Sequence, residues 1–415
     1  MKKLLLSGGV PLHGEVSVTG FKNAALPILF ATILTNGVSV IENLPRIRDV
    51  KGALDILGAM GAHVCMQGPH TAEIDTRPLS PCTAPAHLAS TFRASSYLLG
   101  AELGRFGRSR VALPGGCRIG ARPLDLHILA LTSLGADMVL KEGEIKACAG
   151  RLCGTEITFP IPSVGATVNA MLGAVLAEGE THIYGAAREP HIVELANYLN
   201  AAGADICGAG ERVITVRGVK SLHGICYRLM PDMIEAGTFL TMLGAAGGEI
   251  ALLGADPGPL ASLLAPLSKM GIRVGCEGKR LVAARHGPIA PISVTAEPYP
   301  GFPTDMHPQL TALLTLAEGE STIRDTVFPD RFAYAEELMR MGARLSLGEG
   351  AVHITPSRLH GATVCARDLR AGAALAVAGL AAEGRTAILD ADVLERGYED
   401  LPQKLRALGA NVKEM

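Results

Sequence analysis

The sequence predicts an α/β protein of two domains, each built from three repeated units. A short signature, an apolar residue followed by Gly and then Ala or Ile, recurs six times along the 415 residues. Its glycines are Gly61, Gly135, Gly203, Gly271, Gly342 and Gly409, with spacings of 74, 68, 68, 71 and 67 residues. Each follows an apolar helical pattern and precedes a strand-like segment, which is typical of a left-handed glycine at a helix C-terminus.

A second series of glycines divides each unit in half. Gly37, Gly107, Gly179, Gly247, Gly319 and Gly384 each close an apolar helical run and open a strand. Each unit therefore has the predicted order βαβαββ, and it is longer than the 20–50 residues of linearly stacked repeats. We expect one domain to hold residues 21–228 and the other to hold 229–415. Residues 1–20 are expected to complete the second domain, because the last unit lacks an obvious final partner strand.

Composition excludes several classes of protein. Hydrophobic residues make up 48% and charged residues 19%, which is enough for large cores and argues against disorder. The net charge of -2 gives no general field for nucleic acid or an anionic membrane. The longest apolar runs, Ala24–Leu34 and Ala371–Ala382, fall short of the ~20 residues of a membrane helix. The apolar stretch after Lys3 is too short for a secretory signal.

The cysteines indicate a reducing compartment. There are nine, an odd number, with no Cys-x-x-Cys pair and no His at metal-ligand spacing. Scattered thiols of this kind are typical of cytoplasmic proteins, so we expect a cytoplasmic location and no metal. Eight of them are expected to be small core residues. The ninth, Cys117, lies in a glycine-rich loop beside Arg118 and near Arg122, and positive neighbours favour a thiolate.

Aligning the six units brings charged residues to equivalent helix starts. The first helices of the six units begin near Lys22, Arg93, Ser163, Asp232, Asp305 and Asp368, and Arg370 follows shortly after the last of these. The second helices begin near Arg46 and Arg48, Arg122, Arg188, Asp256, Arg331 and Arg396. Ser163 and the aspartates can equally be N-caps. A cation there is disfavoured by ~0.3–1 kcal/mol. One such Arg is best explained by solvation or by a nearby carboxylate, such as Glu399 for Arg396.

Cations at several equivalent positions are harder to explain singly. Repetition would bring them to one end of each domain, where guanidinium groups and helix N–H groups together bind anions. We therefore expect a polyanionic ligand, held between two domains whose helix ends face each other.

At these positions the chain resembles the UDP-N-acetylglucosamine 1-carboxyvinyltransferases, a family of enolpyruvyl transferases. The matching stretches are Lys22–Pro27, Arg93–Ser95, Leu113–Cys117 with Arg122 and Pro123, Ser163–Thr167, Ala187–Pro190, Phe302–Met306, Asp330–Phe332, Asp368–Arg370 and Arg396–Glu399. Their joint order and spacing are specific, and they extend over the whole chain. The resemblance implies two inside-out α/β domains of three βαβαββ units each, and a ligand cleft closed by the loop that carries Cys117.

The resemblance also implies a reaction and a set of roles. The family transfers the enolpyruvyl group of phosphoenolpyruvate to the 3-hydroxyl of UDP-N-acetylglucosamine, the first committed step of peptidoglycan synthesis. Phosphoenolpyruvate would be held by Lys22, Arg122 and Arg396. The amino sugar would be held by Asn23, Asp305 and the backbone near Val327. The uridine diphosphate would lie near Arg93, Pro123, Leu124, Asp125, Leu126, Ser163, Val164 and Gly165, and the charged surface would be completed by Arg331, Asp368 and Arg370.

Four of these residues would serve the chemistry directly. Asp305 would act as base and Cys117 as the acid and the site of alkylation by fosfomycin, with Lys22 and Arg396 as catalytic cations. No cofactor or metal is implied, because Lys and Arg supply the positive charge. We expect a monomer or weak homo-oligomer, with no nucleic-acid or membrane partner.

The chain departs from the family pattern at four positions. Phe21, Ile161, Met233 and His307 stand where the family commonly has other residues. Two alternatives stay open. One is a catalytically weak or silent paralogue that binds UDP-sugars, although it would not need to keep Lys22, Cys117, Asp305 and Arg396. The other is an enzyme like 5-enolpyruvylshikimate-3-phosphate synthase, which shares the architecture and the transfer but lacks the Gly-Gly-Cys loop. A ring-shaped nucleic-acid clamp also uses internal repeats, but the charge disfavours it.

Overall fold

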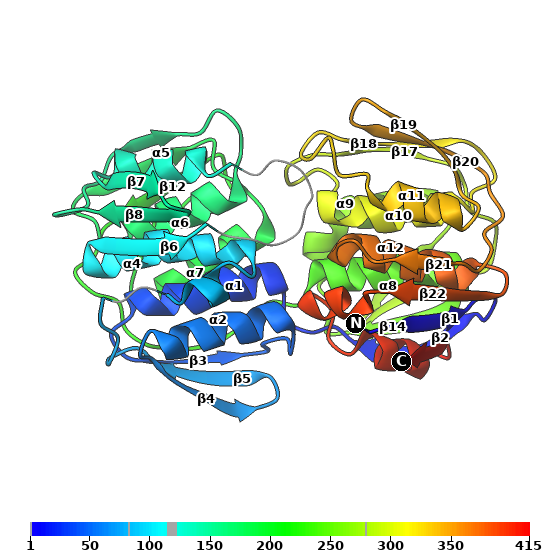
Figure 1. Cartoon of the computed structure of the whole chain (residues 1–415), viewed down its shortest axis with the longest axis horizontal. Coiled ribbons are helices and arrows are strands. Elements are labelled where there is room, and N and C mark those ends of the chain that lie inside the picture. The colour runs from blue at the N-terminus through cyan, green and yellow to red at the C-terminus, as the bar shows by residue number, and fades with distance from the viewer. Residues whose placement is uncertain (1, 82–83, 114–122, 279) are drawn as a thin grey trace. The chain divides into compact units, whose positions relative to one another are not determined.

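The computed structural model describes residues 2–81, 84–113, 123–278 and 280–415, and they divide into two compact units (Figure 1). Unit 1 contains residues 2–19 and 231–415, and unit 2 contains the described residues of 20–230. Within these residues, every helix is too short or too polar to cross a lipid bilayer.

The described residues of unit 2 form three small sheets. Their strand orders are β13 (Cys226–Arg228), β3 (Val38–Glu42), β5 (Thr71–Asp75), β4 (His63–Gly68); β6 (Arg108–Ala112), β8 (Glu144–Cys148), β7 (Asp137–Lys141); and β11 (Asp205–Cys207), β12 (Val213–Arg217), β10 (Glu180–Tyr184), β9 (Glu156–Thr158). Strand β3 pairs in parallel with β13, and β10 with β9, while the other pairs are antiparallel. A parallel pair needs a long crossover, which a helix supplies in each repeat.

The described residues of unit 1 repeat this plan. The orders are β21 (Thr363–Cys365), β22 (Arg385–Leu389), β1 (Leu4–Ser7), β23 (Asn411–Glu414); β15 (Arg273–Glu277), β16 (Arg280–Arg285), β14 (Gly248–Leu253), β2 (Leu12–Ser17); and β17 (Ser293–Ala296), β18 (Ser321–Asp325), β20 (Ala351–Thr355), β19 (Arg344–Gly348). Strands β14, β18 and β22 each have one parallel neighbour. Five of the six sheets in the described chain therefore share one mixed pattern.

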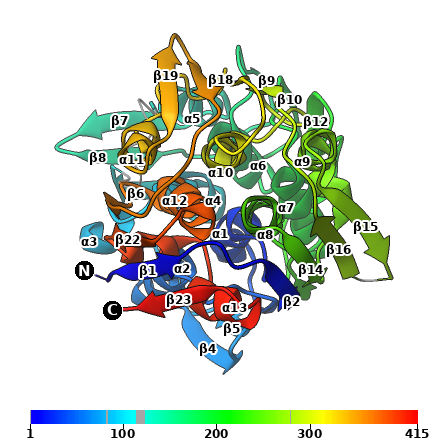
Figure 2. The ribbon, with the colours of Figure 1, turned by 90° about the vertical axis from the view of Figure 1, so that its right-hand side faces the viewer.

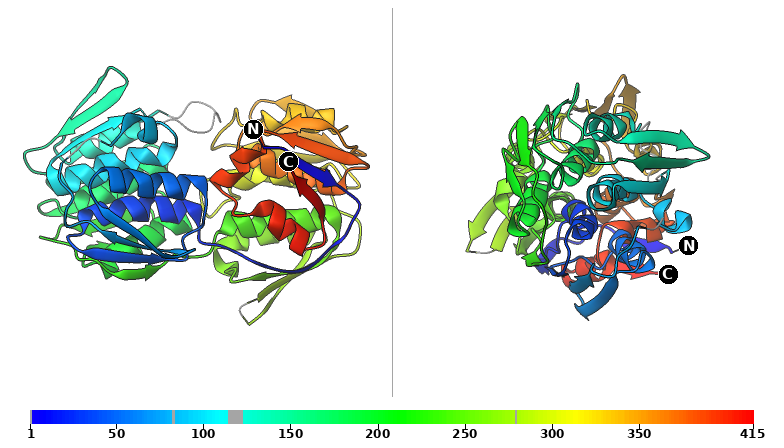
Figure 3. Two further views of the ribbon diagram at one scale, coloured as in Figure 1. Left: turned by 60° about the horizontal axis from the view of Figure 1, so that its bottom comes forward. Right: turned by 90° about the vertical axis from the view of Figure 1, so that its left-hand side faces the viewer.

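The N-terminal segment completes two of the sheets of unit 1. Strand β1 lies between β22 and β23 and is antiparallel to both, whereas β2 pairs in parallel with β14. Both chain ends therefore lie close together in unit 1 (Figure 3). Strands β1 and β2 therefore belong to two different sheets of unit 1, the unit that also holds the last repeats.

Helices fall into an inner and an outer set. The inner helices are α1 (Lys22–Ala31), α4 (Leu98–Phe106) and α6 (Val164–Ala174) in unit 2, and α8 (Met233–Ala246), α10 (His307–Leu314) and α12 (Leu369–Ala381) in unit 1. The outer helices are α2 (Arg48–Ala59), α5 (Asp125–Ser133) and α7 (Pro190–Ala201), and α9 (Pro257–Lys269), α11 (Tyr334–Arg340) and α13 (Leu401–Ala407). Short segments α3 (Ala86–Ala89), η1 (Thr32–Leu34), η2 (Arg93–Tyr97), η3 (Thr304–Met306) and η4 (Ala391–Arg396) complete the set.

Burial separates the two sets of helices. Every residue of α10 is buried, while α9 buries only the stripe Leu260, Leu263 and Leu267. A helix that is apolar on all sides belongs inside a protein, and one with a single apolar stripe covers a core. In Figure 2, α8, α10 and α12 lie in the middle of unit 1 with its sheets around them. This is the inside-out arrangement that the family resemblance implied.

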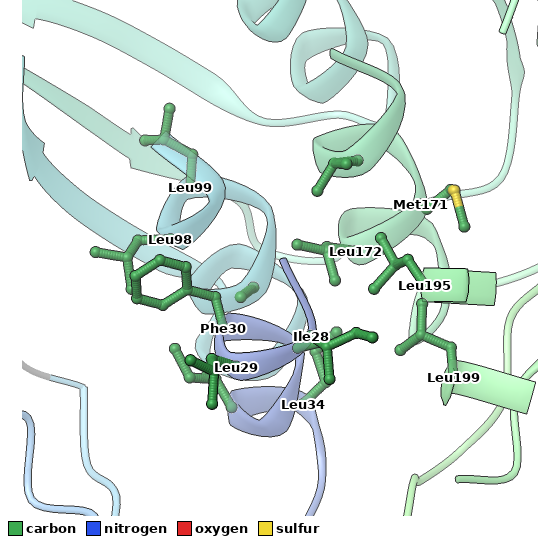
Figure 4. Close-up of a cluster of buried hydrophobic side chains, with 14 of the residues drawn as sticks. Ile28, Leu29, Phe30, Leu34, Leu98, Leu99, Met171, Leu172, Leu195 and Leu199 are labelled. Atoms are coloured by element: carbon green, nitrogen blue, oxygen red, sulfur yellow. The ribbon is translucent and has the colours of Figure 1, made fainter. Parts of the chain in front are cut away.

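Apolar side chains from the three inner helices and the outer helix α7 meet in the core of unit 2. Figure 4 shows Ile28, Leu29 and Phe30 of α1 beside Leu98 and Leu99 of α4, with Leu172 of α6 and Leu195 of α7 completing the cluster. All of these side chains are fully buried. Full burial of such a side chain contributes about 1.5–3 kcal/mol, so this packing is the main stabilising term of the unit.

The six signature glycines adopt the predicted conformation. Each has a positive φ between 85° and 104° and lies one residue beyond the C-cap of an outer helix. In each repeat the next N–H donates back across the turn, as Ala62 does to Leu57 at 3.0 Å and Ala410 to Leu405 at 3.0 Å. This is the Schellman turn, in which a left-handed residue satisfies the last helix carbonyls. The repeat is therefore fixed by backbone chemistry as well as by hydrophobic pattern.

One buried acid makes the stability of unit 2 sensitive to pH. Glu102 of α4 is 1% exposed, and burial raises its pKa to about 7 despite hydrogen bonds from Ser109 Oγ at 2.5 Å and the Arg110 N–H. The folded state therefore binds this proton more tightly than the unfolded chain, and stability falls as pH rises from about 4.5 through about 7.

Glu102→Gln should abolish this part of the pH dependence. We expect the variant to gain on the order of 3 kcal/mol relative to the wild type between pH 4.5 and pH 8, measured by urea denaturation. The control is Glu211→Gln, an exposed acid of the same unit. Parallel pH profiles for the wild type and Glu102→Gln would contradict the assignment.

Candidate functional site

A carboxylate between two arginines is the centre of the charged cluster in unit 1. Asp305 Oδ1 accepts from Arg331 Nη1 at 2.8 Å, and Asp305 Oδ2 accepts from Arg370 Nη2 at 2.9 Å. The side chains of Arg331 and Arg370 are only 6% and 4% exposed, whereas that of Asp305 is 26% exposed. These three residues, here called the Asp305 cluster, come from η3, the segment before α11, and α12.

The cluster holds Asp305 in its ionised form. Burial alone would raise the pKa of this carboxyl, but the charges of Arg370 and Arg331 outweigh that effect and hold the pKa well below its usual range. Burial alone would lower the pKa of Arg370, but Asp305, Tyr398 and Asp232 outweigh that effect and raise the pKa above its usual range. The site is therefore a carboxylate with two permanent cations over the whole working pH range.

Further polar groups fix the position of Arg370. Its Nη1 donates to the Tyr398 hydroxyl at 3.1 Å, and that oxygen lies 3.0 Å from Thr238 Oγ1 on α8. Asp232 caps α8 by accepting from the N–H groups of Ile234 and Glu235. Burial raises the pKa of Asp232 to about 6, with Arg370 acting in the opposite direction. Arg370 is thus positioned from two sides before any ligand binds.

Asp325, at the end of β18, joins the Asp305 turn to the next loop. Its Oδ1 accepts from the N–H groups of Val327 at 2.8 Å and Phe328 at 2.9 Å, while its Oδ2 accepts from Thr304 Oγ1 at 2.5 Å. The Val327 N–H is therefore already used, which leaves its carbonyl as the backbone group that can meet a ligand. The prediction that the backbone near Val327 holds the amino sugar therefore concerns the carbonyl of Val327 and not its N–H.

In unit 2, Lys22 is paired within the protein. Its Nζ lies 2.7 Å from Asp49 Oδ2, with side chains 12% and 6% exposed, so Asp49 in the first turn of α2 orients the ammonium group at the start of α1. The next residue, Asn23, is half-buried. Arg93 begins η2 and donates from Nη2 to the Pro123 carbonyl at 3.1 Å. The structure therefore brings Arg93 to the segment that also contains Leu124, Asp125 and Leu126.

The start of α6 packs closely against α5. Ser163 caps α6 through the Ala166 N–H, and Val164 is the first residue of that helix. A Cβ added at Gly165 would lie 2.6 Å from the ring of His127, so only glycine allows this approach. His127 Nδ1 lies 2.7 Å from Asn169 Nδ2, and Asn169 Oδ1 accepts from the Gly100 N–H at 2.8 Å. Residues 123–127 and the 163–165 turn are thereby brought together.

The structure decides which of the four predicted N-caps are real. Ser163, Asp232 and Asp368 each accept from backbone N–H groups of their helices. Asp305 makes no such cap and uses both oxygens on arginines. Arg396 is the last residue of η4, and α13 begins only at Leu401, so it does not itself start the outer helix. Cys117 and Arg122 lie outside the described residues.

Several residues of the site were not found from the sequence. Asp49, Asp325, His127, Asn169 and Tyr398 orient the predicted groups through contacts between distant segments. Tyr398 lay inside a stretch quoted for the resemblance, and it could have been found there. The others carried no local signal. Within the described part of the chain, no group of three His, Cys, Asp or Glu side chains is arranged to hold a metal.

The four departures fall in different settings. Phe21 is buried at the start of α1 and packs edge-on against the His191 ring at 5.5 Å. Met233 is buried at the first position of α8, and His307 is fully buried at the first position of α10. Ile161 is 64% exposed just before the Ser163 cap. None of the four departures replaces a member of the Asp305 cluster.

Removing one arginine should expose the energetic cost of the buried charges. Arg370→Met leaves Asp305 with one guanidinium, and we expect a loss of about 3–5 kcal/mol in the free energy of unfolding. Urea denaturation at pH 7 measures it, with Arg324→Met, an exposed Arg of the same unit, as the control. Equal losses in both variants would show that the cluster contributes little.

Comparison with known proteins gives one consistent result. The family model described as EPSP synthase (3-phosphoshikimate 1-carboxyvinyltransferase) matches residues 6–405. A UDP-N-acetylglucosamine 1-carboxyvinyltransferase of Nitratidesulfovibrio vulgaris is 46% identical over 417 residues and covers 100% of both chains. UDP-N-acetylglucosamine 1-carboxyvinyltransferase 3 of Caldanaerobacter subterraneus subsp. tengcongensis is 44% identical and covers 99% of both chains.

Solved structures extend the comparison to the fold. The enolpyruvyl transferase NikO from Streptomyces tendae is 29% identical with a TM-score of 0.91, covering 100% of this chain and 99% of its own. The EPSP synthase of Acinetobacter baumannii is 18% identical with a TM-score of 0.78 over 100% of both chains. At 18% identity this second likeness concerns the fold alone.

Proposed function

Because the chain belongs to the UDP-N-acetylglucosamine 1-carboxyvinyltransferases, a family of enolpyruvyl transferases, we propose that it transfers the enolpyruvyl group of phosphoenolpyruvate to the 3-hydroxyl of UDP-N-acetylglucosamine. Phosphate is released, and the product enters peptidoglycan synthesis. The observation that carries the proposal is the Asp305 cluster, in which a partly exposed carboxylate is held between two buried arginines.

The reaction needs a base, an acid and positive charge. Asp305 takes the proton of the sugar 3-hydroxyl, and the oxygen attacks C2 of phosphoenolpyruvate while Cys117 protonates C3. The Cys117 thiolate formed in this step then takes a proton back from C3, the C2=C3 double bond re-forms, and the C2–O bond to phosphate breaks as phosphate departs. Lys22, Arg122 and Arg396 balance the charge of phosphate and carboxylate. Every charge in these steps is balanced by Lys, Arg, Asp or Cys, so the proposal includes no cofactor and no metal.

The remaining groups serve recognition. We propose that the half-buried Asn23 and the carbonyl of Val327 bind the amino sugar, as the family resemblance implies. The 123–127 segment, with Arg93 hydrogen-bonded to it and Gly165 packed on His127, suits the uridine diphosphate. Guanidinium groups and helix N–H groups are the usual partners of such phosphates. Asp368 acts indirectly, by capping the helix that carries Arg370.

The proposal extends to location and assembly. A nucleotide-sugar substrate and scattered free cysteines fit the cytoplasm, and the described Cys65, Cys148, Cys207 and Cys276 are all exposed thiols without a disulfide. Their exposure also corrects the expectation that most cysteines are core residues, since these lie on outward-facing strands. We propose a monomer or weak homo-oligomer that binds neither nucleic acid nor membrane.

Phosphate release measures the proposed activity directly. The purified chain should release phosphate from phosphoenolpyruvate when UDP-N-acetylglucosamine is present and should not do so with shikimate-3-phosphate. Asp305→Asn should lower kcat by about 10²–10⁴-fold, because the general base is lost. Release with shikimate-3-phosphate alone would replace the proposal, and release with neither acceptor would favour a silent paralogue that binds UDP-sugars.

Replacing the thiol separates acid catalysis from alkylation. Cys117→Asp should retain activity, since a carboxyl can donate the same proton, but it should no longer be labelled by fosfomycin. Mass spectrometry of the treated protein measures the label, with Cys276→Ser as a control that stays labelled. A fosfomycin adduct on Cys117→Asp would place the reactive thiol elsewhere in the chain.

A further inference from the structure

His307 follows Asp305 by two residues, at the first position of α10, and one of its ring nitrogens has no hydrogen-bond partner. The residue is 0% exposed, and its ring packs against Phe332 and Tyr334 at centroid distances of 5.2 and 5.4 Å. Nε2 has no hydrogen bond, although it lies 3.3 Å from Asp325 Oδ2. A buried polar atom left unpaired is costly, so this nitrogen calls for an explanation.

The neighbouring carboxylate is the hub of the site. Asp325 connects the Thr304 hydroxyl to the N–H groups of Val327 and Phe328. Thr304 Oγ1 also accepts from Arg331 Nη1 at 3.2 Å, and the same nitrogen donates to Asp305. Any shift of Asp325 therefore reaches both the catalytic carboxylate and the loop at Val327.

The charge state of the ring follows from its surroundings. Burial, together with the charge of Arg331, lowers the pKa of His307 well below its usual range, although Asp305 acts in the opposite direction. The ring therefore carries a single proton, and the open question is which nitrogen holds it.

Counting protons along the hydrogen-bonded chain distinguishes two arrangements. His307 Nδ1 lies 3.2 Å from the Tyr334 hydroxyl, which lies 2.8 Å from Thr311 Oγ1, and Thr311 Oγ1 lies 2.9 Å from the His307 carbonyl. If Nδ1 holds the proton, it donates to Tyr334, Tyr334 donates to Thr311, and Thr311 donates to the carbonyl. Nε2 then presents a lone pair to a carboxylate oxygen, which is repulsive.

The other arrangement removes this repulsion at small cost. If Nε2 holds the proton, Thr311 donates to Tyr334 and Tyr334 donates to Nδ1. Only the bond from Thr311 to the His307 carbonyl is lost, and the helix ladder of α10 already supplies that carbonyl with a donor. A small rotation of the ring then aligns Nε2–H with Asp325 Oδ2.

We propose that His307 is a positioning residue of the transferase site: as the neutral Nε2–H tautomer it donates to Asp325 and so fixes the Thr304–Asp305 turn and the Val327–Phe328 turn together. The inference rests on the proposed function for its catalytic consequence. The tautomer itself depends only on the protein. His307 does not touch substrate, and it acts through Asp325.

The tautomer is read first by nitrogen NMR of ¹⁵N-histidine-labelled protein without substrate. We expect a protonated Nε2 and an unprotonated Nδ1 for His307, assigned by loss of its signals in His307→Gln. Tyr334→Phe removes the donor to Nδ1 and should shift that nitrogen. A protonated Nδ1 would overturn the proposal whether or not the chain is active.

The catalytic consequence is read from paired variants. His307→Leu removes the donor, and we expect KM for UDP-N-acetylglucosamine to rise about tenfold while KM for phosphoenolpyruvate changes much less. His307→Gln keeps a donor of similar reach and should restore most of the affinity. The matched control is His353→Leu, an exposed histidine on β20 of the same unit.

The outcomes separate the two proposals. Wild-type kinetics in His307→Leu with an active wild type would overturn the role of His307 and leave the proposed function intact. An equal defect in His307→Leu and His307→Gln would also overturn it, because a donor would then be irrelevant. An inactive wild type would refute the proposed function, and the NMR result would still decide the tautomer.

Discussion

Pairing of buried charge is the constraint on which the site depends. Taking a carboxylate and two guanidinium groups out of water costs several kcal/mol per ion unless each has a partner of opposite charge. Asp305, Arg331 and Arg370 meet this condition together, and Tyr398 and Thr304 accept further N–H bonds from the two arginines. The charge of Asp232 also favours the charged form of Arg370. The cluster is therefore rigid before any ligand arrives, as electrostatic catalysis requires.

The same pairing limits the basicity that Asp305 can bring to its proposed role. A carboxylate whose pKa is held well below its usual range accepts protons poorly. An incoming phosphate or carboxylate group that engages Arg331 or Arg370 competes for the same N–H donors.

The sequence predicted the repeats well because their signals are local. A left-handed glycine after each outer helix and an apolar inner helix follow from a few adjacent residues, and the structure has both in all six units. Inner helices begin at or within a few residues of Lys22, Arg93, Ser163, Asp232, Asp305 and Asp368. The sequence also identified all three members of the Asp305 cluster as candidate site residues, although it could not show that they pair with one another.

Contacts between distant segments were beyond such reasoning. Arg370 donates to Asp305 across 65 positions, and Asn169 accepts from Gly100 across 69. Asp325 and Asp49 look like ordinary strand-end and helix-start acids in the sequence, and only their partners show that they orient Thr304 and Lys22. Such roles depend on packing of one repeat against another, which the pattern of a single repeat does not contain.

The repeats also show how a structural position becomes a functional one. Asp232, Asp305 and Asp368 occupy equivalent starts of the three inner helices of unit 1. Two of them spend an oxygen on helix N–H groups, which is the ordinary use of an aspartate there. Asp305 instead lies in the short η3 segment before α10, makes no cap, and has both oxygens turned to arginines. Because Asp305 does not cap its helix, both of its oxygens are available to pair with Arg331 and Arg370. Its two equivalents, Asp232 and Asp368, cap the helices that carry Thr238 and Arg370.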